Sequence, residues 1–275
     1  MIIQKFKHGV LCFFLAIACL LPLSSYAQDR GLLISPKRIV FEKGDRLHEL
    51  RLVNRGDSPQ KYRISIVNRA MQKNGQLKPT DKPAANEFFA ADILRYGPRQ
   101  IELNPKEAQT VRLMSRITGN NPDGEYRSHI LIQEIPKPKD AQSVKDAPAD
   151  GLGLDIQAIF GISIPVFFRK GDLSAEVSLT GPKVKKYNED TYVEFDINRS
   201  GNKSIFGTAK IFENGTQIAI LKGIAVYLSA STRTIAVKIP NEYAKAITGK
   251  KLRIIFGAVQ EEEDSPPAEV SFVAN

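Results

Sequence analysis

Hydrophobic and polar residues alternate along most of the chain with a period of two. This period is typical of β-strands, whose successive side chains point to opposite faces of a sheet. Turn residues separate the alternating segments, and Asn74-Gly75 and Asn214-Gly215 are dipeptides that favour tight hairpins. Only residues 241–247 suggest a turn of helix. Many short strands without repeated helical periods predict an all-β protein built from β-sandwiches.

The longest alternating segment covers residues 154–168. Pro165 lacks an N–H group, so the segment is expected at the edge of a sheet. A long apolar edge strand promotes aggregation unless it is covered. Two interpretations follow, a core strand of a sandwich or an edge that is shared with another chain. One face of the segment is wholly apolar and consists of Leu154, Ile156, Ala158, Phe160, Ile162, Ile164, Val166 and Phe168.

Residues 1–27 have the pattern of a secretory signal peptide. Two lysines precede the apolar run Val10–Leu23, and small residues occupy positions 25 and 27. Cleavage is therefore expected before Gln28. The alternative is a membrane anchor, but the apolar run is shorter than a bilayer requires.

Composition narrows the class of protein further. The 275 residues suffice for one large or two ordinary domains, and 42% hydrophobic with 25% charged residues is typical of a globular protein. The net charge of +9 suits an acidic partner without indicating nucleic acid. Both cysteines, Cys12 and Cys19, lie in the signal segment. The mature chain would therefore have no thiol for catalysis or metal binding.

Composition also changes within the chain. Residues 136–153 are rich in proline, glycine, lysine and aspartate, which predicts a long loop before the long strand. Lys170-Gly171-Asp172 is the expected domain boundary. The chain is thus divided into a signal peptide at 1–27, a first domain at 28–170 that contains strand 154–168, and a second domain at 171–275.

No pattern typical of an enzyme is present. Three histidines lack the spacing of metal ligands, and the chain contains no serine elbow, phosphate-binding glycine loop or His-Glu-x-x-His segment. The acidic run Glu261–Asp264 is expected to be a solvated loop. We therefore predict no catalytic residue, no metal site and no cofactor.

Several stretches together resemble the periplasmic chaperones of the chaperone–usher pathway, which assembles pili and other surface fibres. The first domain is covered almost throughout, and the second only as a further immunoglobulin-like sandwich. The resemblance implies two Ig-like β-sandwich domains in an L or boomerang arrangement and a location in the periplasm. The matching stretches are SPKRIVF at 35–41, LRLVN at 50–54, IELNP at 101–105, QEIP at 133–136 and IPVFFR at 164–169.

In that family a long strand lends its apolar face to an incomplete pilin or fimbrial subunit until an outer-membrane usher receives the subunit. By position, Ile156, Ala158 and Phe160 match the donor residues, and Ile162 and Ile164 continue the face. The resemblance thus implies capture of subunits by β-strand addition, in which backbone pairing provides affinity. It leaves open whether the free protein hides this strand by self-association.

Family members also bind the terminal carboxylate of the subunit between two basic residues. Arg38 matches the first of them, whereas the second position is Pro165, which is not basic. Lys37 or another nearby cation is expected to replace the second residue. The departure at Pro165 also keeps an alternative open, an Ig-like surface or adhesive protein without chaperone activity.

Overall fold

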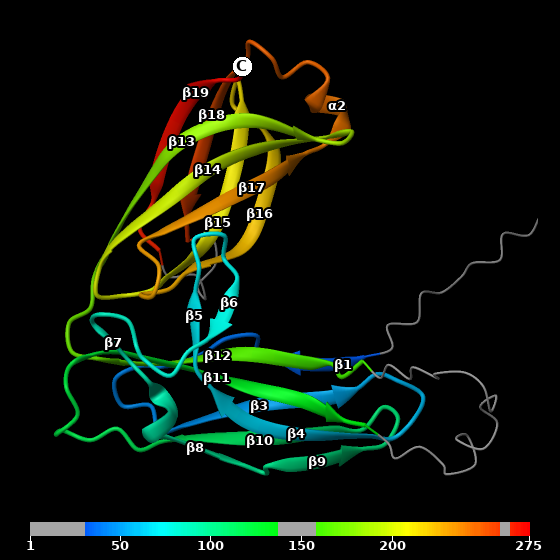
Figure 1. The fold of residues 1–275 in the computed structure, drawn as a ribbon, viewed down its shortest axis with the longest axis vertical. Coiled ribbons are helices and arrows are strands. Elements are labelled where there is room, and N and C mark those ends of the chain that lie inside the picture. The colour runs from blue at the N-terminus through cyan, green and yellow to red at the C-terminus, as the bar shows by residue number, and fades with distance from the viewer. Residues whose placement is uncertain (1–30, 137–157, 259–264) are drawn as a thin grey trace, which may run out of the picture.

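The computed structural model describes residues 31–136, 158–258 and 265–275. Almost all regular structure in these residues is β-strand. The strands form two sandwiches, which are the two arms of an L (Figure 1). We call strands between residues 32 and 170 the N-terminal sandwich and strands between 175 and 273 the C-terminal sandwich. The predicted all-β fold with two Ig-like sandwiches in an L is confirmed.

The N-terminal sandwich has one four-stranded sheet, β1-β3-β10-β8, and one six-stranded sheet, in which β2-β12-β11-β4-β9 follow one another and β7 pairs with β11. Alternate side chains of the two sheets meet in one buried cluster, which includes Leu50, Leu113, Ile130 and Val166. A short 3-10 helix, η1, covers Ala90–Asp92. The strands are β1 (Leu32–Ser35), β2 (Ile39–Phe41), β3 (Leu47–Asn54), β4 (Gln60–Val67), β7 (Glu87–Phe88), β8 (Leu94–Gly97), β9 (Gln100–Leu103), β10 (Ala108–Ser115), β11 (Gly124–Ile135) and β12 (Gly161–Lys170).

The first segment of the chain crosses from one sheet to the other. β1 pairs antiparallel with β3, whereas β2 lies parallel to β12 in the opposite sheet. Pro36 follows β1 directly and cannot donate to a ladder, which is consistent with the strand ending there. Arg38 therefore lies on the connection between the two sheets, immediately before β2 begins.

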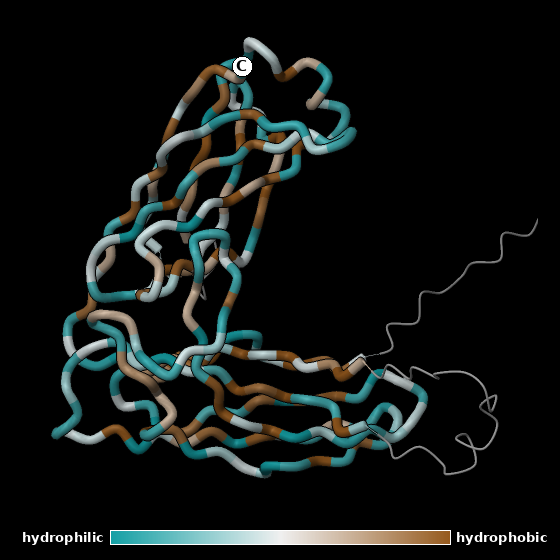
Figure 2. The backbone as a smooth tube through the Cα atoms, in the orientation of Figure 1, coloured by the Kyte–Doolittle hydropathy of each residue, from teal (hydrophilic) through white to brown (hydrophobic). Residues whose placement is uncertain are grey.

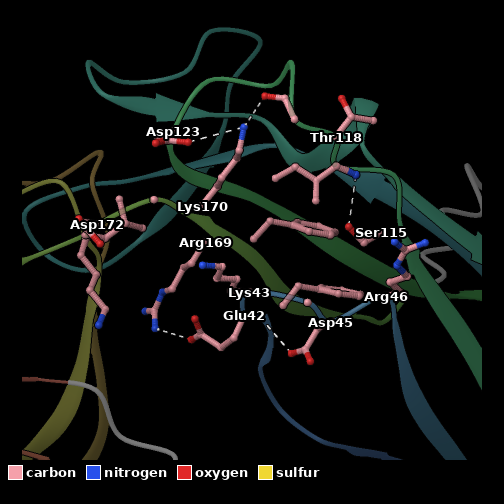
Figure 3. A pocket seen from close by; sticks show the side chains of 18 residues that line it. Glu42, Lys43, Asp45, Arg46, Ser115, Thr118, Asp123, Arg169, Lys170 and Asp172 are labelled. Atoms are coloured by element: carbon pink, nitrogen blue, oxygen red, sulfur yellow. Dashed lines mark hydrogen bonds and ion pairs between the residues drawn. The ribbon is translucent and has the colours of Figure 1, made fainter.

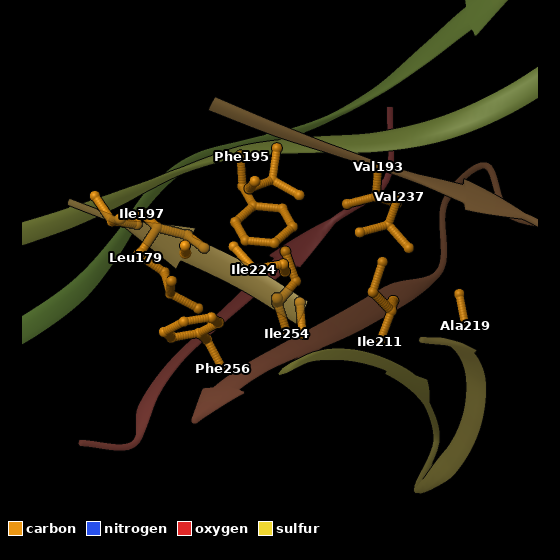
Figure 4. Close-up of a cluster of buried hydrophobic side chains, with 14 of the residues drawn as sticks. Leu179, Val193, Phe195, Ile197, Ile211, Ala219, Ile224, Val237, Ile254 and Phe256 are labelled. Carbon is orange, nitrogen blue, oxygen red and sulfur yellow. The ribbon is translucent and has the colours of Figure 1, made fainter. Parts of the chain in front are cut away.

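The C-terminal sandwich has a three-stranded sheet, β13-β14-β17, and a four-stranded sheet, β16-β15-β18-β19. Inward-facing side chains of both sheets fill its core, among them Phe195, Ile211 and Phe256 (Figure 4). The predicted helical turn is α2 (Asn241–Ala244). The strands are β13 (Ala175–Tyr187), β14 (Asp190–Gly201), β15 (Ile205–Glu213), β16 (Thr216–Val226), β17 (Thr232–Ile239), β18 (Lys251–Gly257) and β19 (Ala268–Val273).

A hairpin from the N-terminal half of the chain reaches the C-terminal sandwich. Strands β5 (Arg69–Met71) and β6 (Leu77–Pro79) rise from the lower arm toward the upper arm (Figure 1). Met71 is 4% exposed and belongs to the core cluster of the C-terminal sandwich. The N–H of Met71 also donates a hydrogen bond of 2.8 Å to the hydroxyl of Ser229. We call residues 69–79 the bridging hairpin, because this segment packs against the core of the other sandwich.

One detail of the sequence interpretation needs correction. The long strand is expected at 154–168, but within the described residues it begins at Gly161 and extends to Lys170. Both hairpins predicted from Asn-Gly turns are present, since β5 pairs with β6 and β15 with β16. The signal segment, the 137–153 part of the predicted loop and the acidic run 261–264 lie outside the described residues.

Candidate functional site

The first half of β12 has a free edge. β12 pairs antiparallel with β11 from Gly161 to Lys170, but only Val166–Phe168 pair with β2 on the other side. No described strand pairs with Gly161–Pro165 on that side. Pro165 lacks the N–H that a full ladder would use. Residues 161–165 are therefore an open backbone edge, as the sequence analysis expected at Pro165.

The apolar face of β12 changes from buried to exposed along the strand. Ile164, Val166 and Phe168 are at most 4% exposed and belong to the core of the N-terminal sandwich. Ile162 is 40% exposed and Phe160 is 72% exposed. The N–H of Glu134 still donates a hydrogen bond of 2.9 Å to the carbonyl of Phe160, so the backbone remains extended beside β11. An ordered but uncovered apolar segment results.

The structure places the five predicted donor residues in different environments. Ala158 and Phe160 are exposed and precede β12, and Ile162 is the exposed end of the strand. Ile164 is a core residue of the chain itself. Ile156 lies outside the described residues. Figure 2 shows hydrophobic positions continuing along β12 toward the free end of the N-terminal sandwich.

A hollow of about 720 Å³ lies beside this exposed segment. It separates the start of β1 from the start of β12, where no strand among the described residues joins the two sheets. Tyr62 and Ile132 contribute apolar lining, and Phe160 and Ile162 stand at its border. The hollow gives apolar side chains of another molecule room next to the free edge.

Arg38 lies in the cleft between the sandwiches, whereas Lys37 does not share its surroundings. The guanidinium carbon of Arg38 is 4.2 Å from the centroid of the Phe206 ring, which belongs to β15 of the C-terminal sandwich. Lys37 is exposed, and Arg38 is partly buried.

Sequence reasoning missed a buried ionic cluster at the junction of the two sandwiches. Arg127 on β11 and Glu87 on β7 are each 2% exposed, and their side chains form an ion pair of 2.5 Å. Arg127 also donates to the carbonyl of Arg69, and its guanidinium lies 4.3 Å from the centroid of the Tyr227 ring. The cluster therefore connects β11, the bridging hairpin and the C-terminal sandwich.

Glu125 forms a second contact across the same junction. It is fully buried, and its Oε2 accepts a hydrogen bond of 3.1 Å from the N–H of Ser204. Arg169 pairs with Glu125 at 3.5 Å and with Glu42 at 3.2 Å. Burial raises the pKa of Glu125, and the hydrogen bond from Ser204 and the charge of Arg169 oppose that rise. These contacts join the end of β12 to the C-terminal sandwich.

His129 lies opposite Pro165 in the β11–β12 register. It is fully buried, and neither ring nitrogen has a hydrogen-bond partner in the described residues. Burial, with smaller contributions from the charges of Arg127 and Arg69, lowers the pKa of His129 to about 3. His129 is therefore neutral at ordinary pH and cannot supply the cation that Pro165 lacks.

A second hollow lies near the chain crossing between β12 and β13 (Figure 3). Its volume is about 820 Å³, and charged side chains line it. Lys170 donates to the carbonyl of Gly119 at 2.8 Å and pairs with Asp123 at 3.6 Å. The N–H of Glu42 donates to Asp45 at 3.0 Å. Several polar groups of this hollow are thus engaged within the chain, and it is a weaker candidate than the open edge.

The described residues contain no group of three or more histidine, cysteine, aspartate and glutamate side chains that could hold a metal ion. No helix among them is long and apolar enough to cross a membrane.

Comparison with known proteins gives the family. Residues 31–173, more than half of the chain, match the family model described as "Pili and flagellar-assembly chaperone, PapD N-terminal domain". The chain belongs to this chaperone family. The match includes the free edge of β12, Arg38 and the bridging hairpin. The comparison with curated proteins gave no match.

Three solved structures to which the chain is similar illustrate the range of the match. The YadV chaperone is 14% identical, with 88% of this chain and 99% of that chain covered and a TM-score of 0.47. The Escherichia coli chaperone DraB is 14% identical, with coverage of 87% and 95% and a TM-score of 0.44. The CsuC–CsuE chaperone–tip adhesion subunit complex of Acinetobacter baumannii is 13% identical, with coverage of 86% and 98% and a TM-score of 0.46.

Proposed function

We propose that this protein is a periplasmic chaperone that captures pilus or fimbrial subunits by donating the start of β12 and its preceding residues, and that it delivers them to an outer-membrane usher. The observation that carries the proposal is the free edge at Gly161–Pro165, continued by the exposed side chain of Phe160. On this proposal, residues 28–170 form the chaperone domain and 171–275 the second domain. No catalytic step is involved.

Affinity on this proposal comes from two sources. Backbone groups of Gly161–Pro165 hydrogen-bond to an unpaired strand of the subunit, which is recognition by β-augmentation. Ala158, Phe160 and Ile162 place apolar side chains in the open core of the subunit, and burial of a side chain as large as Phe160 or Ile162 contributes about 1.5–3 kcal/mol. Ile156 extends this face by its place in the alternating pattern.

The direction of the bound strand follows from Arg38. β2 begins at Ile39 and occupies the same side of β12 from Val166 onward. A guest strand on Gly161–Pro165 therefore ends next to Arg38. If that end is a terminal carboxylate, the guest must run parallel to β12, as β2 does. Arg38 then binds the carboxylate, because its planar guanidinium matches both carboxylate oxygens.

Co-purification of subunits from the periplasm tests strand donation. The protein is expressed with subunits that are encoded beside an usher, and Phe160→Asp is compared with the wild type. We expect the variant to keep the fold, since Phe160 is 72% exposed, and to lose the subunits. Leu47→Asp is the control, because Leu47 is an equally apolar side chain, 51% exposed, on the opposite sheet. Normal capture by Phe160→Asp would contradict the proposal.

The role of Arg38 has its own test. Arg38→Ala should weaken subunit binding far more than it lowers the melting temperature. Subunits that lack their last residues should bind the wild type and Arg38→Ala equally. A preference of the wild type for complete subunits that persists in Arg38→Ala would exclude Arg38 as the anchor.

Location separates this proposal from a surface or adhesive protein. A chaperone should be released with the soluble contents of the periplasm, whereas an adhesive protein should remain with the outer membrane or enter the medium. Cell fractionation with an antibody to the C-terminal sandwich distinguishes these outcomes.

A further inference from the structure

The hollow beside the free edge of β12 is lined by polar as well as apolar side chains. Most of the polar ones are engaged within the chain. The side-chain amide of Asn54 donates to backbone carbonyl groups, and that of Gln60 donates to the hydroxyl of Ser58 at 3.3 Å. Asp57 pairs with Lys106 at 3.7 Å. These side chains therefore have partners without a ligand.

Glu134 and Tyr62 are the exceptions. They are cross-strand partners on β11 and β4, and both line the hollow. Glu134 follows the core residues Ile130 and Ile132 at a spacing of two, so its side chain lies on the inner face of the sheet. Tyr62 is 7% exposed. Neither the carboxylate of Glu134 nor the hydroxyl of Tyr62 has a hydrogen-bond or ion-pair partner among the described residues.

The unneutralised charge at this hollow is negative, although the whole chain carries a net charge of +9. Two charged side chains line the hollow, and Asp57 is paired there whereas Glu134 has no ion-pair partner in the described residues. Burial, with a smaller contribution from the charge of Glu134, raises the pKa of Tyr62. Tyr62 therefore keeps its proton, and its hydroxyl oxygen and the Glu134 carboxylate both offer acceptors. The hollow thus suits a hydrogen-bond donor with a positive charge.

A guest strand on Gly161–Pro165 would present side chains to this hollow. Ile162 is on the core-facing side of β12 and borders the hollow. Side chains directly opposite each other on neighbouring strands lie on the same face of the sheet. The guest residue that pairs with Ile162 therefore points between β1 and β12, toward the side of the hollow where Glu134 lies.

We infer that the hollow is a subsite for one lysine or arginine side chain of the captured strand. The apolar stem of that side chain packs on Ile132 and Ile162, and its cationic tip binds the carboxylate of Glu134 and the hydroxyl oxygen of Tyr62. A wholly apolar guest residue would cover Glu134 without pairing it, which is costly. This inference rests on the proposed function and adds a preference for one class of side chain at one position of the guest.

Synthetic peptides provide the probe. Each alternates threonine and valine and carries a fluorophore at its N-terminus, and one valine at a time is replaced by lysine or by norleucine. Norleucine keeps most of the lysine stem without the charge, so the ratio of the two affinities isolates the cationic tip. Fluorescence anisotropy with the whole protein measures both affinities. At one position the wild type should bind the lysine peptide roughly tenfold more tightly. No preference for lysine at any position would overturn the inference.

The ratio of the two affinities also identifies the role of Glu134. Glu134→Gln should bring the ratio at that position close to one, and Tyr62→Phe, which removes only the hydroxyl, should lower it less. Glu102→Gln is the matched control, since Glu102 lies in the same sheet, is 55% exposed and pairs with Lys61 at 3.2 Å. Its ratio should equal that of the wild type. If Glu134→Gln weakens both peptides equally and leaves the ratio unchanged, Glu134 is only structural and the inference is wrong.

The norleucine peptides report on strand donation by themselves. Phe160→Asp should abolish their binding. If it leaves their affinity unchanged, strand donation is wrong, and the subsite falls with it. If Phe160→Asp abolishes their binding while Glu134→Gln keeps the full preference for lysine, strand donation stands and only the inference about the hollow is wrong.

Discussion

The backbone N–H of Thr234 donates a hydrogen bond of 2.8 Å to the carbonyl of Lys73, although Lys73 belongs to the bridging hairpin and Thr234 to the C-terminal sandwich. The side chain of Lys73 also pairs with Asp196 at 2.9 Å. The hairpin tip therefore extends the sheet edge at β17. It connects the two arms at a point away from the single chain crossing between β12 and β13.

Met71 should make the stability of the C-terminal sandwich depend on the hairpin. Met71→Ala removes a side chain that is 4% exposed in that core, and we expect a loss of about 2–4 kcal/mol in the free energy of unfolding. Urea unfolding followed by circular dichroism measures the loss. Met114→Ala is the matched control, because Met114 is 47% exposed. Equal losses in the two variants would contradict a structural role of the hairpin in that core.

Removal of one partner of the buried Arg127–Glu87 ion pair should lower the free energy of unfolding strongly. Arg127→Met leaves the Glu87 carboxylate buried and unpaired, so we expect a loss of about 3–5 kcal/mol in the free energy of unfolding. The double variant Arg127→Met, Glu87→Leu should recover part of that loss. Arg112→Ala is the surface control, since its pair with Glu49 has side chains that are 71% and 56% exposed. Its loss should not exceed about 1 kcal/mol.

His129 should make the protein less stable in acid. The folded pKa is about 3, below the ordinary value of 6.5. As pH falls from about 6.5 toward 3, the unfolded chain binds a proton that the folded chain does not, so stability falls by up to about 1.4 kcal/mol per pH unit. His129→Leu should remove this part of the slope.

Unfolding free energies of the wild type and His129→Leu at several pH values between 7 and 4 provide the measurement. His48→Leu is the control, because the His48 side chain is 35% exposed. Parallel stability curves of the wild type and His129→Leu would contradict the assignment.

Neighbouring positions on the apolar face of β12 should have opposite roles. Ile164→Ala should cost about 2–4 kcal/mol of folding stability, because Ile164 is 4% exposed. Ile162→Ala should cost less than about 1 kcal/mol, because Ile162 is 40% exposed. Urea unfolding measures both values. At equal folded fraction, Ile162→Ala should weaken subunit binding more than Ile164→Ala does. Similar losses of folding stability in the two variants would contradict this division of the face.

Local patterns predicted much of the fold. Alternation of apolar residues identified strands such as β3 and β12, and the Asn74-Gly75 dipeptide identified the bridging hairpin, because these signals depend on neighbouring residues alone. The same alternation could not locate the start of β12. An alternating segment stays alternating whether or not a partner strand lies beside it, so only the pairing at Gly161 defines that end.

The junction could not be predicted, because its contacts join distant parts of the chain. Glu125 and Arg127 lie in β11, a strand that is buried on both faces over most of its length. Their partners Ser204 and Glu87 are 79 and 40 residues away in the sequence. A pair of charges in one strand does not reveal which distant residues neutralise them.

The start of β2 also bears on the register in which a guest strand would bind. On the proposed function, a guest strand laid along Gly161–Pro165 would meet Ile39, where β2 begins, and its last residue would set the register of the whole strand. One additional residue at the guest's terminus would shift the register of the whole guest strand by one residue. Side chains that had faced the core would then face solvent. Length counted from the terminus, more than the identity of any one side chain, would then decide which chains are accepted.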